Sequence, residues 1–215
     1  MQIQLRGVVY ALAIFAGPSV AAGIDDCVVV PATACVGFDL RSAHWPDAKL
    51  GGADLSRSKL NRANLLGADL QNARLERANL NGANLAGANL EGARLTRASF
   101  VGANLESATL RAAILRRAQL NGAVLNGADL ADADLQGANL PAVRLHGARM
   151  QRANLSNTLL LRADMREADL TGANFSYAAL RSADLTGAIL TDARFTGADM
   201  RGCKGCPSRR SRDAK

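Results

Sequence analysis

The chain is poor in aromatic residues and in histidine. Phe, Trp and Tyr make up 4% of its 215 residues, and it has two histidines and one tryptophan. With so few aromatic anchors, a core must be built from aliphatic side chains, and hydrophobic residues make up 48% of the chain. The two histidines, His44 and His146, stand far apart, which argues against a histidine-based metal centre. We therefore expect no metal and no cofactor.

An apolar run long enough to span a bilayer is also lacking in the first part of the chain. Gly7 to Ala16 has no polar side chain except Tyr10, but it is shorter than the roughly 20 residues of a spanning helix. Arg6 precedes this stretch, and small residues follow it up to Ala22. This order is typical of a secretory signal peptide. We predict a signal peptide at residues 1–22 with cleavage near Ala22, and a periplasmic or secreted mature chain without a transmembrane segment.

The body of the chain has almost no excess of either charge. The formal net charge is +7, but the last 15 residues carry six basic side chains against Asp213, and residues 23–200 carry a net charge of +1. The basicity therefore belongs to a tail, which could contact an anionic surface or polymer. A solubilising tail without a target is the alternative interpretation.

A five-residue repeat dominates the rest. Every position divisible by five from Leu40 to Met200 is Leu, Phe, Met or Trp, which makes 33 consecutive units. Two residues earlier stands Ala, with the exceptions Phe38, Ser58, Val143 and Thr158. The unit reads Ala, Asp or Asn, Leu, and two variable residues, of which the second is often Gly.

The period of five fits neither a helix nor a flat strand. Five residues advance 500° on a helix and reverse the face on a strand, so the chain must bend once per repeat. Between residues 38 and 202, no Asp, Glu, Lys or Arg falls at the 66 Ala and Leu positions. Because a buried unpaired charge is very costly, these positions are predicted to face a closed core.

Tandem units such as Ala83-Asn84-Leu85-Ala86-Gly87 resemble the pentapeptide-repeat family. The resemblance implies an all-β fold, a right-handed quadrilateral β-helix with four repeats per coil and about eight coils. We expect an N-terminal cap at residues 23–37, the β-helix at 38–202, and a cysteine-containing end with a basic tail at 203–215. Trp45 is expected to plug the first coil, and Pro141 to loosen one ladder bond.

The four cysteines flank the predicted solenoid. A rod of about eight coils would hold the two groups roughly 40 Å apart, whereas a disulfide needs Cα atoms within ~7 Å. The resemblance therefore favours two staples, Cys27–Cys35 and Cys203–Cys206. A redox site or half of a zinc site remains an alternative interpretation of the second pair.

Two surface features are candidate binding sites. If residues 20 apart stack, Arg57, Arg77, Arg97 and Arg117 form one column, which neighbours such as Glu76 and Glu91 could partly neutralise. A solvated edge with local ion pairs is the alternative. A candidate apolar patch, which could equally be ordinary exposed surface, comprises Pro141, Ala142, Leu159, Leu161 and Ala179.

No catalytic constellation is visible, so we expect a non-enzymatic scaffold. Its partner would be a protein or an anionic polymer or surface. The alternative comes from the resemblance: some family members mimic duplex DNA and bind DNA gyrase, which protects it from quinolones. That activity needs an acidic surface and a cytoplasmic location, which the near-neutral body and the predicted signal peptide disfavour.

Overall fold

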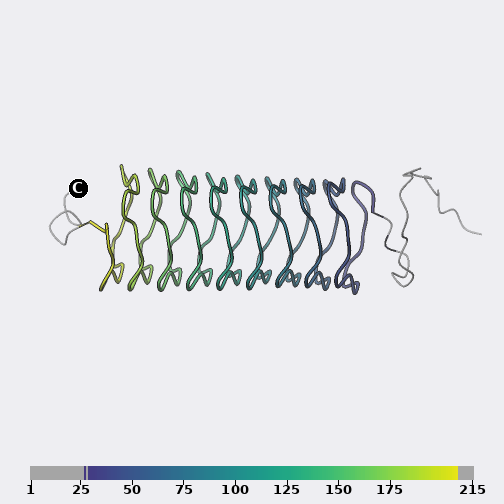
Figure 1. Ribbon diagram of the computed structural model, residues 1–215, viewed down its shortest axis with the longest axis horizontal. Coiled ribbons are helices and arrows are strands. Elements are labelled where there is room, and N and C mark those ends of the chain that lie inside the picture. Colours follow the sequence, from purple (N-terminus) through teal and green to yellow (C-terminus); the bar gives the residue numbers. More distant parts are fainter. Residues whose placement is uncertain (1–26, 28, 208–215) are drawn as a thin grey trace, which may run out of the picture.

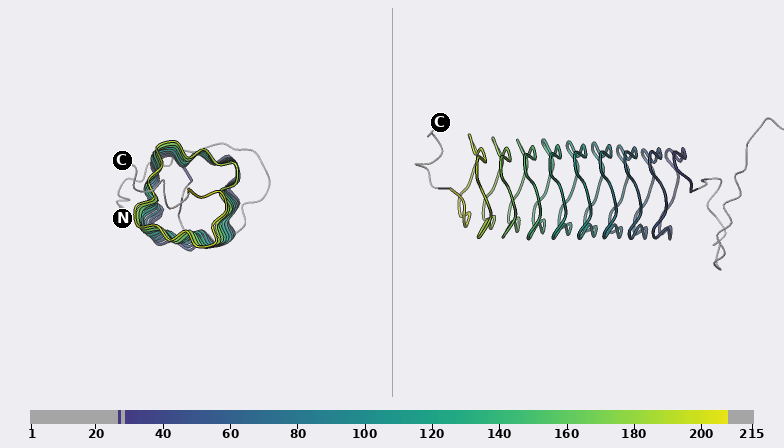
Figure 2. Two further views of the ribbon diagram at one scale, coloured as in Figure 1. Left: turned by 90° about the vertical axis from the view of Figure 1, so that its left-hand side faces the viewer. Right: turned by 90° about the horizontal axis from the view of Figure 1, so that it is seen from above.

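The chain forms a straight rod with a four-sided cross-section in the computed structural model (Figure 1). The structure describes residue 27 and residues 29–207, so the predicted signal peptide at 1–22 and most of the predicted basic tail lie outside the described residues. Viewed along the axis, the coils superimpose on one another (Figure 2, left). The fold is the right-handed, quadrilateral β-helix that the family resemblance implies.

Single parallel bridges join the coils in a continuous ladder. In the described residues there is no helix and no strand longer than one bridged residue. The first bridge joins Ala34 to Asp54 and the last joins Asp184 to Lys204, and every bridge connects residues 20 apart. A coil therefore contains four pentapeptides, one for each side, and coils are spaced by ~4.8 Å, the usual distance between paired strands.

The repeat around Leu90 shows how the ladder is bonded. The amide of Leu90 donates to the carbonyl of Thr109 in the next coil (2.7 Å). The amide of Asn89 donates to the carbonyl of Ala68 in the preceding coil (2.9 Å). The flat sides of the coil thus satisfy their backbone through the two neighbouring coils, as buried backbone requires.

Each corner is a type II β-turn. In the same repeat, the amide of Ala93 donates to the carbonyl of Leu90 (3.0 Å), and Gly92 has a φ of +64°. A positive φ at the third turn residue but not at the second, Glu91, distinguishes type II from types I and I′. The amide of Glu91 has no place in the ladder and donates instead to Oδ1 of Asn89 (3.1 Å). This bond explains why Asp and Asn are frequent before Leu.

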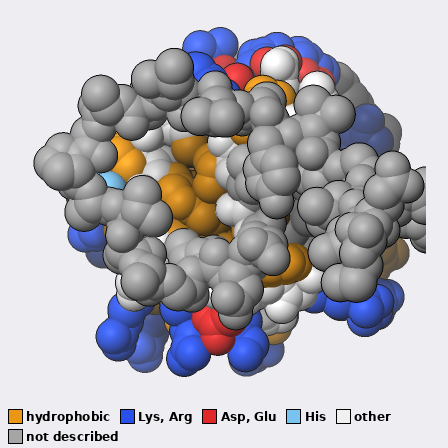
Figure 3. Space-filling view, turned by 90° about the vertical axis from the view of Figure 1, so that its right-hand side faces the viewer, with side chains coloured by type: hydrophobic (Ala, Val, Ile, Leu, Met, Phe, Trp, Pro, Cys, Tyr) orange, Lys and Arg blue, Asp and Glu red, His pale blue; other side chains and the backbone are white. Residues whose placement is uncertain are grey.

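The interior is filled by the Ala and Leu columns. From Leu50 to Leu185 every inward Leu, Phe or Met side chain is at most 1% exposed. Looking from the N-terminal end, hydrophobic side chains fill the ring, and Lys and Arg lie on its outer surface (Figure 3). Trp45 is partly buried against this core. No charged side chain is buried among the described residues. The inward pattern is strict because a charge in this closed core would be very costly.

The polar exceptions to the Ala rule are satisfied locally. Ser58 and Thr158 are fully buried, and each hydroxyl donates to the carbonyl three residues earlier, at 2.7 Å and 2.6 Å. The expectation for Pro141 was wrong. Pro141 occupies the first turn position, whose amide the ladder does not use, and its carbonyl still accepts from Gly122 (3.0 Å). The ladder therefore continues through the proline.

Both ends of the rod carry a disulfide. Cys27 is bonded to Cys35 and Cys203 to Cys206, with Cα–Cα distances of 5.5 Å and 5.8 Å. This is the pairing predicted from the sequence. The ladder begins earlier than the expected cap boundary, because the turn-and-bridge pattern is already present from Pro31 and Cys35 occupies a fully buried inward position.

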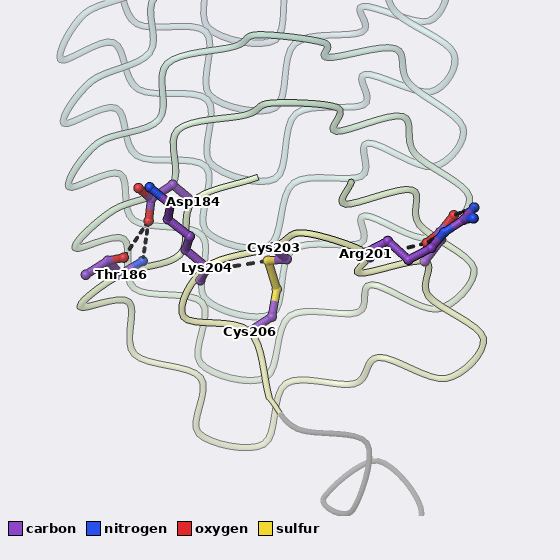
Figure 4. The surroundings of a disulfide bond; sticks show 7 residues. Asp184, Thr186, Arg201, Cys203, Lys204 and Cys206 are labelled. Atoms are coloured by element: carbon purple, nitrogen blue, oxygen red, sulfur yellow. Dashed lines mark hydrogen bonds and ion pairs between the residues drawn. A yellow bond between two sulfur atoms is a disulfide. The ribbon is translucent and has the colours of Figure 1, made fainter. Parts of the chain in front are cut away.

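At the C-terminal end the chain leaves the last coil through the Cys203–Cys206 disulfide (Figure 4). Gly205 takes the place of an inward leucine and has a φ of +69°. A Cβ there would lie 2.5 Å from the carbonyl carbon and oxygen of Leu185 and 2.7 Å from the amide nitrogen of Thr186. Only glycine allows the chain to pass this close to the preceding coil.

Candidate functional site

Four arginines stack at one corner of the rod. Arg57, Arg77, Arg97 and Arg117 hold the positive-φ turn position of successive coils, with φ between 57° and 60°, and all four are exposed. Each backbone amide donates to a carbonyl of the next coil at 2.9–3.0 Å. The ladder thus fixes the spacing of the arginine column, as the 20-residue register predicts.

The carboxylates of Asp54, Glu76 and Asp134 lie on the same corner or the adjoining flat side, and each is paired with an arginine outside the column. These partners lie on the flat side and at the first turn position beside the column. The pairs are Arg74–Asp54 (3.7 Å between Nε and Oδ2), Arg94–Glu76 (2.6 Å between Nε and Oε1) and Arg116–Asp134. In the described part of the chain, the four arginines of the column make no ion pair.

The expected neutralisation by Glu76 and Glu91 is not what the structure shows. Glu76 accepts from Arg94 and also from the hydroxyl of Ser56 (3.1 Å). Glu91 accepts from the side-chain amide of Gln71 (3.4 Å). Both carboxylates therefore serve groups outside the column, and its positive charge stays uncompensated.

At a neighbouring corner, in contrast, an arginine is neutralised by a carboxylate of the preceding coil. Arg152 and Asp132 occupy the same turn position in successive coils, and two hydrogen bonds of 2.6 Å join the guanidinium to the carboxylate. The Arg152 guanidinium lowers the pKa of Asp132 below its usual range, against the opposing effect of partial burial. Opposite charges stacked one coil apart can therefore pair directly, whereas the arginine column stacks like charges.

A surface hollow of about 560 Å³ opens along the arginine column. We call it the arginine groove. Its lining combines cationic, hydroxyl and amide side chains with one glycine. The lining residues are Glu76, Arg77, Thr96, Arg97, Arg116, Arg117, Gln136, Gly137 and Asn157.

Gly137 ends the column and lines the groove without a side chain. It occupies the position that follows Arg117, and its φ is +68°. Cγ of Arg117 lies 3.5 Å from the point where a Cβ of residue 137 would stand, so the arginine side chain extends over the glycine. Sequence reasoning missed Gly137, Thr96, Gln136 and Asn157, although the 20-residue register could have placed them at this corner.

The apolar patch is also brought together. Leu159 is bridged to Asn139 and Ala179, and its side chain is 46% exposed. Leu161, which is 38% exposed, occupies the same first turn position as Pro141 in the next coil. Pro141 is half-buried, and Leu159 is two residues from Asn157, which lines the arginine groove.

The histidines remain separate. His44 contacts the side-chain amide of Asn64 (3.3 Å), and His146 lies 3.8 Å from Glu167. Among residue 27 and residues 29–207, no three His, Cys, Asp or Glu residues are grouped as metal ligands. In that same part of the chain, no helix has the length and apolarity needed to cross a membrane. The disulfides suggest an oxidising compartment.

Comparison with known proteins assigns the repeat to a family. The family model for pentapeptide repeats matches eight copies, in segments 47–77, 73–111, 113–152, 148–187 and 173–204. Among the curated proteins, none matches this chain.

Solved structures of other repeat proteins are similar to this chain. HetL, a pentapeptide repeat protein involved in heterocyst differentiation regulation from the cyanobacterium Nostoc sp. strain PCC 7120, is 36% identical over 79% of this chain and 84% of its own, with a TM-score of 0.42. A pentapeptide repeat protein from the Arabidopsis thaliana thylakoid lumen is 30% identical over 46% of this chain and 68% of its own, with a TM-score of 0.38. QnrB1, a plasmid-mediated fluoroquinolone resistance protein, is 20% identical over 80% of this chain and 90% of its own, with a TM-score of 0.43.

The coil geometry is established by the ladder of this chain and not by the TM-scores, which are below 0.5. The family-model match and the identity to HetL decide the assignment, and the chain belongs to the pentapeptide-repeat family.

Proposed function

We propose that this protein is an exported, non-enzymatic scaffold that presents a rigid surface to a binding partner. The observation that carries the proposal is the disulfide at each end of the rod. Disulfides persist in oxidising compartments and are rare in the cytosol. Together with the predicted signal peptide, they support a periplasmic or secreted location.

The scaffold role is supported by the contrast between the inward and the outward positions of each coil. Inward side chains form an almost fully buried core. The charged side chains of the described residues lie at outward positions, which the ladder holds in register. Such a rod presents columns of side chains with little freedom to rearrange. Binding through a fixed array costs less ordering entropy than binding through mobile segments.

The experiment is an intact-mass measurement on the full chain expressed in a Gram-negative host. The protein is recovered from the periplasmic fraction and alkylated with and without prior reduction. We expect a mature form that begins near Gly23 and resists alkylation at all four cysteines until it is reduced. A matched chain with Ala21→Leu and Ala22→Leu, which alters the predicted cleavage site, should stay uncleaved.

A full-length cytoplasmic chain with four reactive thiols would overturn the proposal. Gyrase binding would then become the next measurement, because the family alternative requires that location.

A further inference from the structure

We propose that the arginine groove binds an acidic polysaccharide that runs along the rod axis. The inference rests on the proposed function in one respect, because it places the protein outside the cytoplasm. It adds the chemical class of the partner and the residues that recognise it.

The first observation is an excess of positive charge that the protein itself does not compensate. Seven arginines and three carboxylates lie on this corner and the adjoining side between residues 54 and 134, and each carboxylate is paired with an arginine outside the column. The four arginines of the column therefore repel one another. A bound polyanion would neutralise them and release counterions.

The second observation is the spacing. The ladder holds the four arginines one coil apart, so with ~4.8 Å per coil the column is about 14 Å long. A single small anion can reach only neighbouring guanidinium groups. A linear polymer with one carboxylate on each sugar places charges at intervals comparable to the coil spacing, and so can engage the whole column. Arginine suits this role because its planar fork binds a carboxylate through two hydrogen bonds.

The third observation is the lining between the charges. The hydroxyl of Thr96 and the side-chain amides of Gln136 and Asn157 line the groove, and none of these side chains is hydrogen-bonded to another described residue. Such groups both donate and accept, as sugar hydroxyls require. Gly137 lines the same hollow and contributes no side chain to it.

The same corner continues beyond the groove with an aromatic surface. Tyr177 holds the next turn position after Asn157, and its side chain is 66% exposed. Its ring lies against Gly197, with Cδ1 2.6 Å from the point where a Cβ of that residue would stand. The amphipathic ring of Tyr177 presents an apolar face to the part of the polymer that extends beyond the groove.

Other polyanions fit less well. A polypeptide usually gains affinity by adding a strand to a free sheet edge, but the corner amides of the column are already bonded to the next coil. A single-stranded nucleic acid is bound through bases stacked on successive aromatic side chains, and the lining of the groove contains none.

The test measures binding of the oxidised, purified chain to immobilised polygalacturonate at low salt. The probe is compared with its methyl-esterified form, which has the same backbone without charge, and with oligothymidylate and poly-glutamate. The double variant Arg77→Gln, Arg97→Gln removes two charges from the groove. Its matched control, Arg62→Gln, Arg162→Gln, removes two exposed arginines from the same positive-φ turn position on another corner.

We expect the unesterified polymer to bind best, and the groove variant to bind it about tenfold more weakly, since each exposed charge contact contributes up to about 1 kcal/mol. The control variant should bind like the unmodified chain, because both variants keep the basic tail. Gly137→Asn, which fills the groove without changing its charge at a φ that Asn tolerates, should also weaken binding.

Four outcomes would overturn the inference: no binding at low salt, equal binding of the esterified polymer, equal losses in the two double variants, or tighter binding of oligothymidylate or poly-glutamate. These outcomes are independent of the export measurement. An exported, oxidised chain that ignores polygalacturonate would refute this inference alone, whereas a cytoplasmic chain with free thiols would refute the proposed function.

Discussion

The inward columns of the solenoid and its corner columns accept very different residues at equally regular positions. Inward positions hold Leu, Ala and a few residues of similar character, and from Leu50 to Leu185 the inward large side chains are at most 1% exposed. One corner column, in contrast, contains Arg117, Gly137, Asn157 and Tyr177 in four successive coils. The difference shows that the core restricts the residues at inward positions, whereas the corner positions accept charged, polar, aromatic and glycine residues. Four changes would break or sharpen this contrast.

The largest effect is expected from a charge placed inside. Ala98→Asp puts a carboxylate at a position that is fully buried, where it would have no partner. We expect the free energy of unfolding to fall by about 4 kcal/mol or more. Urea unfolding followed by circular dichroism measures the loss. The outward change Val124→Asp is the control, since this position directly before an inward leucine commonly holds Asp or Asn. Its bridged neighbours are Asn104 and Arg144, so the change should be nearly neutral. Equal losses would contradict the inward–outward division.

A smaller effect is expected from the corner backbone itself. Gly87 has a φ of +64°, and a Cβ there would have no neighbour within 4 Å. Gly87→Ala should therefore cost only the backbone strain, about 1 kcal/mol, in a thermal or urea melt. Gly87→Asn should cost less, because Asn tolerates the left-handed conformation. A stabilised alanine variant would refute the turn assignment.

Acid should act only through the outward columns, because the inward ones carry no titrating group. The hydroxyl of Thr171 holds the pKa of Asp169 below its usual range, as the amide of Thr171 and the side chain of Gln151 also do, against partial burial. Arg201 and Arg181 lower the pKa of Asp199. A depressed folded-state pKa stabilises the protein above the unfolded value of about 4, and this stability is lost as the pH falls through the folded pKa.

Thermal melts from pH 7 to pH 2 should therefore show a stability that declines below about pH 4. Asp169→Asn keeps the oxygen that accepts from the Thr171 amide but does not titrate, so its melting temperature should fall less steeply with acid. A decline of the same steepness in this variant would argue against Asp169 as a contributor.

The smallest effects concern charges at the corners, and they should have opposite signs at equivalent backbone positions. Arg152→Gln removes the partner of Asp132 and should lower the melting temperature slightly. Arg77→Gln with Arg97→Gln relieves repulsion between stacked guanidinium groups and should raise it slightly. Both shifts should shrink in 1 M salt, where charges are screened within about 3 Å. Shifts of one sign would show that the column is not repulsive.

Much of the fold could be predicted because each repeat states the same constraint. The sequence alone shows the Ala and Leu positions, the lack of charge at those positions and the cysteines at both ends of the repeat. The extent of the ladder at its N-terminal end was harder, because Pro31 and Cys35 do not match the Ala and Leu consensus, yet the backbone around them makes the same turn and bridge.

The candidate site was predicted in part. The spacing of 20 placed the arginine column correctly, but it suggested Glu76 as a neutralising neighbour. Glu76 instead pairs with Arg94, which is 18 residues away rather than one or 20. Such diagonal contacts depend on side-chain rotamers across two coils, and a column register does not encode them.

The sequence by itself determined which side chains are buried, because a five-residue period with two apolar positions leaves a bending chain only one inward face. The family resemblance implied four repeats per coil, and the bridges between residues 20 apart show that such residues share a column. Only the tertiary structure decided which carboxylates are paired, and that a groove lies along the unpaired arginine column. Burial follows from local pattern, whereas charge compensation and surface shape depend on competing partners brought together from different coils.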